Sequence, residues 1–147
     1  MSSRSSYPAR GGGGATTVPQ QALFDPAKPL AELVDALAEK EADQFGRDLN
    51  SSQLRRFFGE VKDLHRQGQT GVDYKAVIEP RFKMLRSKVA YATHKVGATK
   101  GVPDSFKAFI DGGVKKVQTK EQFECFVKHF EAVVGFWFGK YADKRER

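Results

Sequence analysis

The sequence predicts an all-α fold, a compact bundle of about five helices preceded by a disordered N-terminal tail. In five segments, apolar residues recur at steps of three and four, the spacing that places side chains on one face of a helix. No segment alternates apolar and polar residues in the way that a half-buried strand does. The 147 residues include twelve phenylalanines, four tyrosines and one tryptophan, which supply the apolar area that a packed domain needs.

The chain divides into a flexible tail over residues 1–24 and a single helical domain over residues 25–147. The tail is rich in serine up to Val18, contains four consecutive glycines and has no hydrophobic period. It lacks the apolar segment of a secretory signal, and no run approaches the roughly 20 apolar residues of a membrane span. The lone Cys125 is typical of a reducing compartment, so we expect a cytoplasmic protein without membrane contact.

The first helix is expected to begin between Pro26 and Pro29 and to end before Gly46. Its apolar stripe is narrow and consists of Leu30, Leu33, Val34 and Leu37. Its other faces are acidic, with Lys40 opposed to Glu32, Asp35, Glu39, Glu41 and Asp43. Because such a surface repels nucleic acid, we interpret it as a solvated outer face or as a contact for basic residues of a neighbouring copy.

The second helix is predicted over residues 51–67, with Gly68 at its end. Its N-cap is Asn50 or Ser51, because Gln53 stands where a capping box has Glu or Gln. Its apolar face consists of Leu54, Phe57, Phe58, Val61 and Leu64, and the two phenylalanines are expected to pack against the last helix. One flank carries Arg55, Lys62 and Arg66 beside the small Gly59, whereas Arg56 diverges from that flank.

A third helix is predicted over residues 80–96, after a short lead-in that Asp73 caps and that Pro80 interrupts or kinks. Its apolar face consists of Phe82, Leu85, Val89, Ala92 and Val96. One flank repeats a basic residue every seven positions, at Arg81, Lys88 and Lys95, and Arg86 lies on the other flank.

Two further helices complete the predicted bundle. The fourth opens at Asp104 or Ser105, and the pair Gly112–Gly113 predicts a break near its middle. Its inward residues are Phe106, Phe109, Ile110, Val114 and Val117. The last helix follows a capping-box signal at Thr119 and Gln122, and its core face consists of Phe123, Phe126, Val127, Phe130, Val134, Trp137, Phe138 and Tyr141. Cys125 and Phe136 lie off that face and are expected to be exposed, which indicates a protein contact.

The positive charge of the chain is concentrated in one block. The formal net charge is +7, and residues 81–120 hold ten Lys or Arg against two Asp or Glu. The segments before and after this block are close to neutral. Solubility alone does not require such clustering, whereas a concentrated positive field attracts phosphate backbones or an acidic partner.

The titratable residues show no catalytic or metal-binding arrangement. His65 and His94 are scattered, and Cys125 with His129 supplies only two of the ligands that a zinc site needs. No sequence context marks a nucleophile, and the loop at residues 97–101 lacks the spacing of a phosphate-binding P-loop. We therefore expect a binding protein, not an enzyme, with no metal and no cofactor.

The basic helix flanks favour recognition of a nucleic-acid backbone, because Lys and Arg neutralise phosphates without reading bases. The aromatic residues fall at core spacing, so no stacking platform for single strands is expected. The connection from Arg66 to Asp73 is longer than the turn of a helix-turn-helix motif, so sequence-specific DNA regulation is less well supported.

Three stretches, in this order and spacing, resemble the small subunit of type III-A CRISPR effector complexes, the Csm complex. They are Ser51-Ser52-Gln53-Leu54-Arg55-Arg56-Phe57-Phe58-Gly59-Glu60-Val61, Arg81-Phe82-Lys83-Met84-Leu85-Arg86-Ser87-Lys88-Val89-Ala90-Tyr91-Ala92 and Phe126-Val127-Lys128-His129-Phe130-Glu131-Ala132-Val133-Val134. The resemblance covers about residues 49–141. It leaves the first forty-eight residues unaligned, and Phe136-Trp137-Phe138 stands where the family usually has a more polar end.

The resemblance implies a non-catalytic protein that binds no metal. Copies would stack into an inner filament along the guide RNA and target RNA, beside other Csm subunits. The family motifs carry over Arg55, Arg56, Arg86 and Lys88 as RNA-contacting candidates, of which Arg56 is the least secure. The flank positions Lys62, Arg66, Arg81 and Lys95 join them, and together we expect these residues to form one groove in which Arg55 is completed by Arg86 and Lys88.

Two other functions remain open at this point. The basic block would also suit an interaction adaptor that meets an acidic protein, the second hypothesis, or a small DNA-binding regulator, the third. The small subunit of type III-B complexes is also all-α, and physical arguments do not distinguish it from the type III-A subunit.

Overall fold

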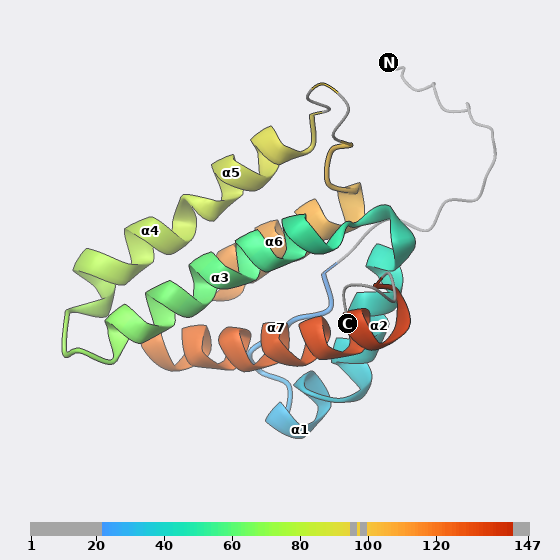
Figure 1. Cartoon of the computed structure of the whole chain (residues 1–147). Coiled ribbons are helices and arrows are strands. Elements are labelled where there is room, and N and C mark those ends of the chain that lie inside the picture. Colours follow the sequence, from blue (N-terminus) through green and yellow to red (C-terminus); the bar gives the residue numbers. More distant parts are fainter. Residues whose placement is uncertain (1–21, 95–96, 98–99, 143–147) are drawn as a thin grey trace, which may run out of the picture.

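The computed structural model describes residues 22–94, 97 and 100–142, and within these residues every regular element is helical (Figure 1). The elements are α1 (Leu30–Leu33), α2 (Ala36–Phe45), the 3₁₀ turn η2 (Gly46–Asp48), α3 (Ser51–Gly68), the π-helical turn η3 (Tyr74–Ile78), α4 (Glu79–Lys83), α5 (Leu85–Ala92), α6 (Asp104–Lys116) and α7 (Lys120–Lys140). They fall into the five predicted helical regions, because α1 with α2 and η3 with α4 and α5 each correspond to one predicted helix. No helix in the described ranges is long and apolar enough to cross a membrane.

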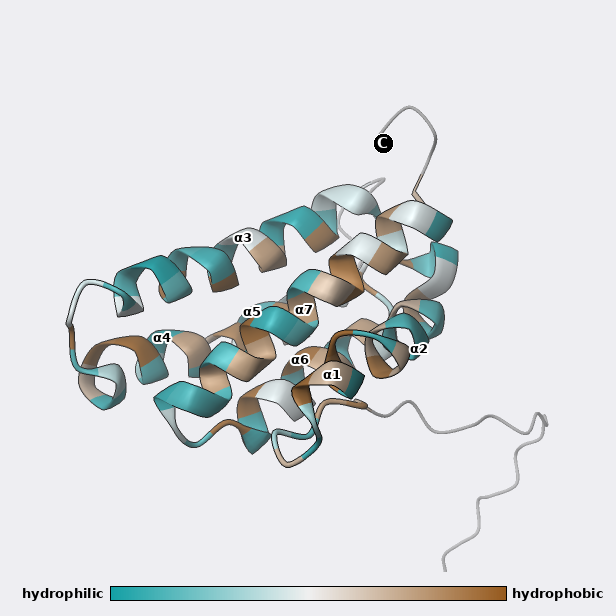
Figure 2. Ribbon diagram, turned by 90° about the horizontal axis from the view of Figure 1, so that it is seen from below, coloured by the Kyte–Doolittle hydropathy of each residue, from teal (hydrophilic) through white to brown (hydrophobic). Residues whose placement is uncertain are grey.

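The long helix α7 organises the bundle. It packs against α2 and α3, and α5 packs mainly on α6. Figure 1 shows α3 running between α4–α5 on one side and α7 on the other. Figure 2 shows hydrophilic and hydrophobic residues alternating along the α3 ribbon, and the buried members are apolar residues such as Leu54, Phe57 and Val61. The centre is aromatic: the Phe109 and Phe130 rings meet edge to face with centroids 4.9 Å apart, and Phe106 and Phe126 pack around them.

The start of α3 confirms the predicted capping box. The Gln53 N–H donates to Asn50 Oδ1 at 2.8 Å, and the Asn50 N–H donates to Gln53 Oε1 at 3.2 Å. The start of α7 is a variant of this arrangement. Thr119 Oγ1 accepts from the Gln122 N–H, but Gln122 Oε1 accepts from the N–H of Gln118, one residue before the cap.

The third predicted helix is divided. Asp73 caps it as expected, since its carboxylate accepts from the Ala76 N–H at 2.8 Å. The first turn is π-helical and precedes Pro80, a residue that cannot donate to the preceding turn and crowds its carbonyl. A turn at Met84 then separates α4 from α5, and α5 ends at Ala92. The predicted end at Val96 lies outside the described residues.

The predicted break in the fourth helix is wrong, because α6 continues through both glycines. A side chain at Gly113 would put its Cβ 2.3 Å from Cε1 of Phe126, so this glycine lets α6 approach α7 closely. A Cβ at Gly112 would lie 2.4 Å from the Cβ of Ala22. The glycines are therefore packing positions, and the closeness they permit offsets their low helix propensity.

The N-terminal segment is more buried than the sequence suggests. Phe24, at the predicted end of the tail, is fully buried against Phe126, with ring centroids 5.2 Å apart. Glu41, predicted on an outer face, is 1% exposed and accepts from the Leu23 N–H at 2.9 Å. Its carboxylate also lies 3.6 Å from Nε2 of the buried His129. Residues 1–21 of the predicted tail lie outside the described part of the chain.

Three other packing predictions turn out differently. In the first helix, Leu33 is buried but Leu30 and Val34 are exposed, because the chain turns between α1 and α2. The predicted exposure of Cys125 and Phe136 is wrong, since both are half-buried against the core.

The two phenylalanines of α3 pack on different helices. Phe58 meets Phe130 of α7 as predicted, with ring centroids 5.2 Å apart. Phe57 meets Phe106 of α6 at 5.4 Å. The aromatic face of α3 therefore joins α6 and α7 to one core.

Candidate nucleic-acid interface

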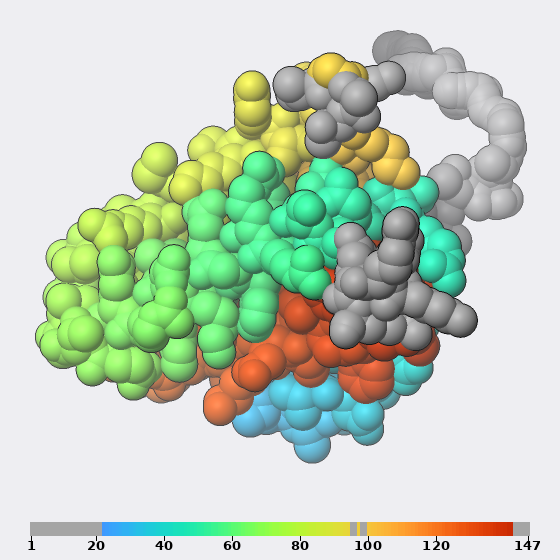
Figure 3. All heavy atoms as spheres, in the orientation of Figure 1, coloured from blue at the N-terminus to red at the C-terminus, as the bar shows by residue number. Residues whose placement is uncertain are grey.

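Two adjoining hollows run between α3 and the α4–α5 segment. One is lined by Arg56, Phe57, Glu60, Ser87, Lys88 and Tyr91. The other is lined by Glu60, Asp63, Leu64, Gln67, Arg81, Met84 and Lys88. Because the hollows share Glu60 and Lys88, they form one continuous depression, which we call the α3–α5 groove. Figure 3 shows α3 and α4–α5 side by side on this face of the molecule, with α7 beyond α3.

Helical periodicity explains which α3 side chains enter the groove. Arg56, Glu60, Asp63 and Gln67 follow one another at steps of four and three, on the flank of α3 that turns toward α4 and α5. Lys88 crosses the groove from α5, with its Nζ 2.7 Å from Oε1 of Glu60.

The two arginines of the groove are held by different contacts. The Arg81 guanidinium donates to Oε1 of Gln67 at 2.8 Å and so also joins the two walls. The Arg56 guanidinium lies over the ring of Phe57, 5.1 Å from its centroid. Three cations from three helices thus converge on one depression.

The predicted flank of Arg55, Lys62 and Arg66 lies elsewhere on α3. The Arg55 guanidinium is 4.9 Å from the ring centroid of Phe138, on α7. Lys62 Nζ lies 5.7 Å from the ring centroid of Phe58, and Arg66 forms an exposed ion pair with Asp63. Arg55 and Lys62 therefore border α7 rather than the α3–α5 groove.

Arg86 lies on the opposite side of α5, facing α6. Its Nε is 3.4 Å from Oδ1 of Asp111, whose other oxygen accepts from Lys107 at 2.7 Å. Lys83 lines the same hollow. Lys95, the last predicted candidate, lies outside the described residues.

A single groove formed by Arg55, Arg86 and Lys88 is therefore not what the structure shows. Arg55 and Arg86 flank different helices, and Arg56, which the sequence separates from the Arg55 flank, is the arginine that lines the same hollow as Lys88. Successive residues on a helix point about 100° apart, so the choice between neighbours depends on where α4 and α5 dock.

The charges of the groove are only partly compensated. Arg56, Arg81 and Lys88 face Glu60 and Asp63. The Lys88 and Glu60 side chains are 49% and 35% exposed, and exposed ion pairs contribute only about 0–1 kcal/mol. A phosphate group that displaces the Glu60 carboxylate from Lys88 therefore loses little in broken contacts.

The shifted pKa values belong to other parts of the fold. Burial raises the pKa of Tyr74 in η3 to about 12. Where α2 meets the end of α7, the hydrogen bond from the Tyr141 hydroxyl lowers the pKa of Asp43. Across the described ranges, no group of three or more His, Cys, Asp or Glu is placed to hold a metal ion.

The residues of this surface that sequence reasoning missed include Glu60, Met84 and Tyr91. Met84 and Tyr91 are 57% and 72% exposed, seven residues apart on the outer face of α4–α5. Their positions opposite Leu85 and Val89 on the helical wheel were the available signal, since both lie off the buried stripe.

A model of the Csm2 Type III-A family matches residues 28–142. The match includes every helix from α1 to α7 and begins well before the region around Leu49 where the sequence motifs start. The comparisons with curated proteins and with solved structures gave no match.

Proposed function

The chain belongs to the Csm2 type III-A family, the small subunits of type III-A CRISPR complexes, and we propose that it binds the backbone of guide RNA and target RNA there without catalysing a reaction. The observation that carries the RNA-binding role is the convergence of Arg56, Arg81 and Lys88 on the α3–α5 groove. Side chains of this kind fix the position of a nucleic acid through its phosphates and carry no sequence information.

The distribution of charge also supports self-association. Glu32 and Asp35 are exposed at the α1–α2 end of the molecule. Lys83 and Arg86, which lie outside the α3–α5 groove, are exposed on α4–α5, at the opposite side of the bundle in Figure 1. Opposite charge on opposite sides favours head-to-tail stacking of copies, the geometry of a filament alongside other Csm subunits and an RNA.

The structure provides a matched test of the groove. One variant carries Gln at Arg56, Arg81 and Lys88. A second carries Gln at Arg55, Lys62 and the exposed Lys128 of α7, none of which lines the groove, so that both lose the same charge. Binding of a fluorescently labelled single-stranded RNA is followed by anisotropy over a range of salt concentrations. Each lost phosphate contact reduces the steepness of the plot of log K against log salt by about 0.7. The slope measured for the groove variant should therefore be shallower by roughly 2.

The second variant should keep most of the affinity and of the salt dependence. Equal losses in both variants would mean that net charge alone drives binding, and the groove assignment would fail. Unchanged binding in both would exclude RNA recognition by these surfaces. Tight sequence-specific binding to duplex DNA instead would favour the DNA-regulator function.

A further inference from the structure

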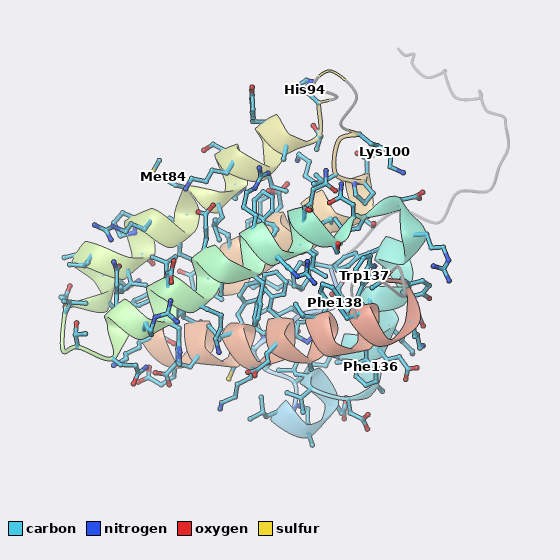
Figure 4. All side chains as sticks on the ribbon, viewed as in Figure 1. Met84, His94, Lys100, Phe136, Trp137 and Phe138 are labelled. Carbon is cyan, nitrogen blue, oxygen red and sulfur yellow. The ribbon has the colours of Figure 1, made fainter. Side chains whose placement is uncertain are left out.

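Tyr91 projects from α5 at the mouth of the α3–α5 groove. Its 72% exposure is the highest among the large hydrophobic residues that the structure describes, and its side chain lines the groove together with Arg56 and Phe57. One turn later, the exposed His94 ring lies 6.5 Å from the Tyr91 ring, at an interplanar angle of 63°. Figure 4 shows His94 at the end of α5, where the helix runs into the loop.

The surroundings of Tyr91 leave the ring accessible. Its neighbours in the chain are Ala90 and Ala92, which are too small to cover it, and Lys88 stands one turn earlier on the groove side. An aromatic ring held in solvent beside cationic side chains is the combination with which proteins bind single-stranded nucleic acids. The sequence did not reveal this platform, because the other aromatic residues of the helices fall at core positions.

We propose that Tyr91, with His94 beside it, is a stacking site for an unpaired nucleobase of an RNA whose phosphates lie on Arg56 and Lys88. The inference rests on the proposed function, since it takes RNA in the groove as given. It adds that this end of the groove binds a nucleotide whose base is not paired. A base paired in the interior of an A-form duplex is stacked on both faces and offers neither to the Tyr91 ring.

The charges around the site favour RNA over an apolar protein surface as the occupant. Arg56 and Lys88 line the same hollow as Tyr91, and Glu60 is the carboxylate opposed to them there. An apolar partner would desolvate these charged groups without pairing them, whereas a phosphate placed near Lys88 keeps them compensated.

The first test is photochemical. A short RNA carrying 5-iodouridine at one position is bound to the full chain and irradiated, and the cross-linked residue is identified by mass spectrometry. Stacking on the platform predicts a cross-link at Tyr91 or His94. A cross-link confined to other residues would overturn the inference.

The second test compares substitutions at the ring. Tyr91→Leu should weaken binding of single-stranded RNA by about 5- to 150-fold, because stacking of one base on an aromatic ring is worth roughly 1–3 kcal/mol. Tyr91→Phe should bind like the unmodified protein. Val72→Ala, which removes an exposed apolar side chain from the loop before η3, outside the groove, is the control and should leave binding unchanged. Binding of a long blunt RNA duplex, in which every pair except the two terminal ones is stacked on both faces, should not respond to any of the three.

The outcomes separate the inference from the function on which it rests. If the unmodified protein binds no RNA, the proposed function fails. If RNA binding depends on Arg56 and Lys88 but Tyr91→Leu binds single strands as well as the unmodified protein does, the stacking site alone is refuted. Release of another subunit by Tyr91→Leu, with RNA binding intact, would show that the ring contacts a protein instead. Circular dichroism checks that each variant keeps its helical content.

Discussion

Glu60 is expected to weaken RNA binding by occupying the groove. Its Oε1 lies 2.7 Å from Nζ of Lys88, so the cation best placed for a phosphate already has an anionic partner. Replacement by the isosteric Gln removes the charge and keeps the shape of the side chain. Because the pair is exposed, Glu60→Gln should change the free energy of unfolding by no more than about 1 kcal/mol.

The effect on RNA binding is larger. A phosphate about 4 Å from the Glu60 carboxylate is repelled by roughly 1 kcal/mol in a solvent-like dielectric, so removing the charge should tighten binding about fivefold. Lys88 becomes available to a phosphate at the same time, and the slope of log K against log salt should steepen by about 0.7. Anisotropy titrations of a labelled single-stranded RNA at several salt concentrations measure both quantities.

Asp111→Asn provides the control. Asp111 also pairs with two basic side chains, Arg86 and Lys107, but on the α6 side of α5. The charge change is identical, so an effect of net charge would appear in both variants. Binding that stays constant or weakens in Glu60→Gln, with the fold intact, would refute the argument that this carboxylate competes with phosphate. Equal tightening in both variants would refute the assignment to the groove.

Two further predictions concern stability. Gly113→Ala should lower the free energy of unfolding by about 1–3 kcal/mol in urea titrations, because the new Cβ would lie 2.3 Å from the Phe126 ring. Gly59→Ala is the control: it lies on an open helix surface and should raise the free energy of unfolding by about 0.5–1 kcal/mol. The hydrogen bond from the Tyr141 hydroxyl lowers the pKa of Asp43 in the folded protein. The ionised carboxylate therefore stabilises the fold at any pH above the unfolded pKa of about 3.9. This stabilisation is lost as the pH falls through the lower pKa of the folded state. Asp43→Asn should therefore have a lower free energy of unfolding than the unmodified protein at pH 6, and the difference should narrow below about pH 4. A difference that does not change with pH would exclude stabilisation by the ionised Asp43 carboxylate.

Local signals were sufficient for most of the helices. The α3 capping box was readable because Asn50 and Gln53 act within one turn, and the same holds for Asp73 before η3. The helices that were misjudged depend on distant residues. Gly113 does not break α6, because its lack of a Cβ lets the Phe126 ring of α7 pack against the helix. Glu41 is buried, because its carboxylate lies beside His129 of α7.

The candidate site was predictable in residue type but not in arrangement. The basic flanks of α3 and of α4–α5 are visible in the spacing, but which flank of α3 faces α5 is set by the tertiary rotation of the helix. Arg55 and Arg56 differ by one step and end up beside different helices. Tyr91 lies off the stripe of Leu85 and Val89, a signal of exposure, but most aromatic residues of these helices are buried, and its place in the groove depends on how α5 docks.

The partial compensation of the groove bears on how the small subunit would work in a complex. With Arg56, Arg81 and Lys88 opposed by Glu60 and by Asp63, which also pairs with Arg66, the groove of one copy presents only part of its positive charge to a phosphate backbone. A single copy is then expected to bind RNA weakly and to release it readily in physiological salt. Copies held side by side on one RNA bind it jointly, because each bound groove raises the effective concentration of the next. If copies stack along RNA as proposed, the carboxylates of the groove would favour binding of RNA by the stacked copies over binding by a free subunit.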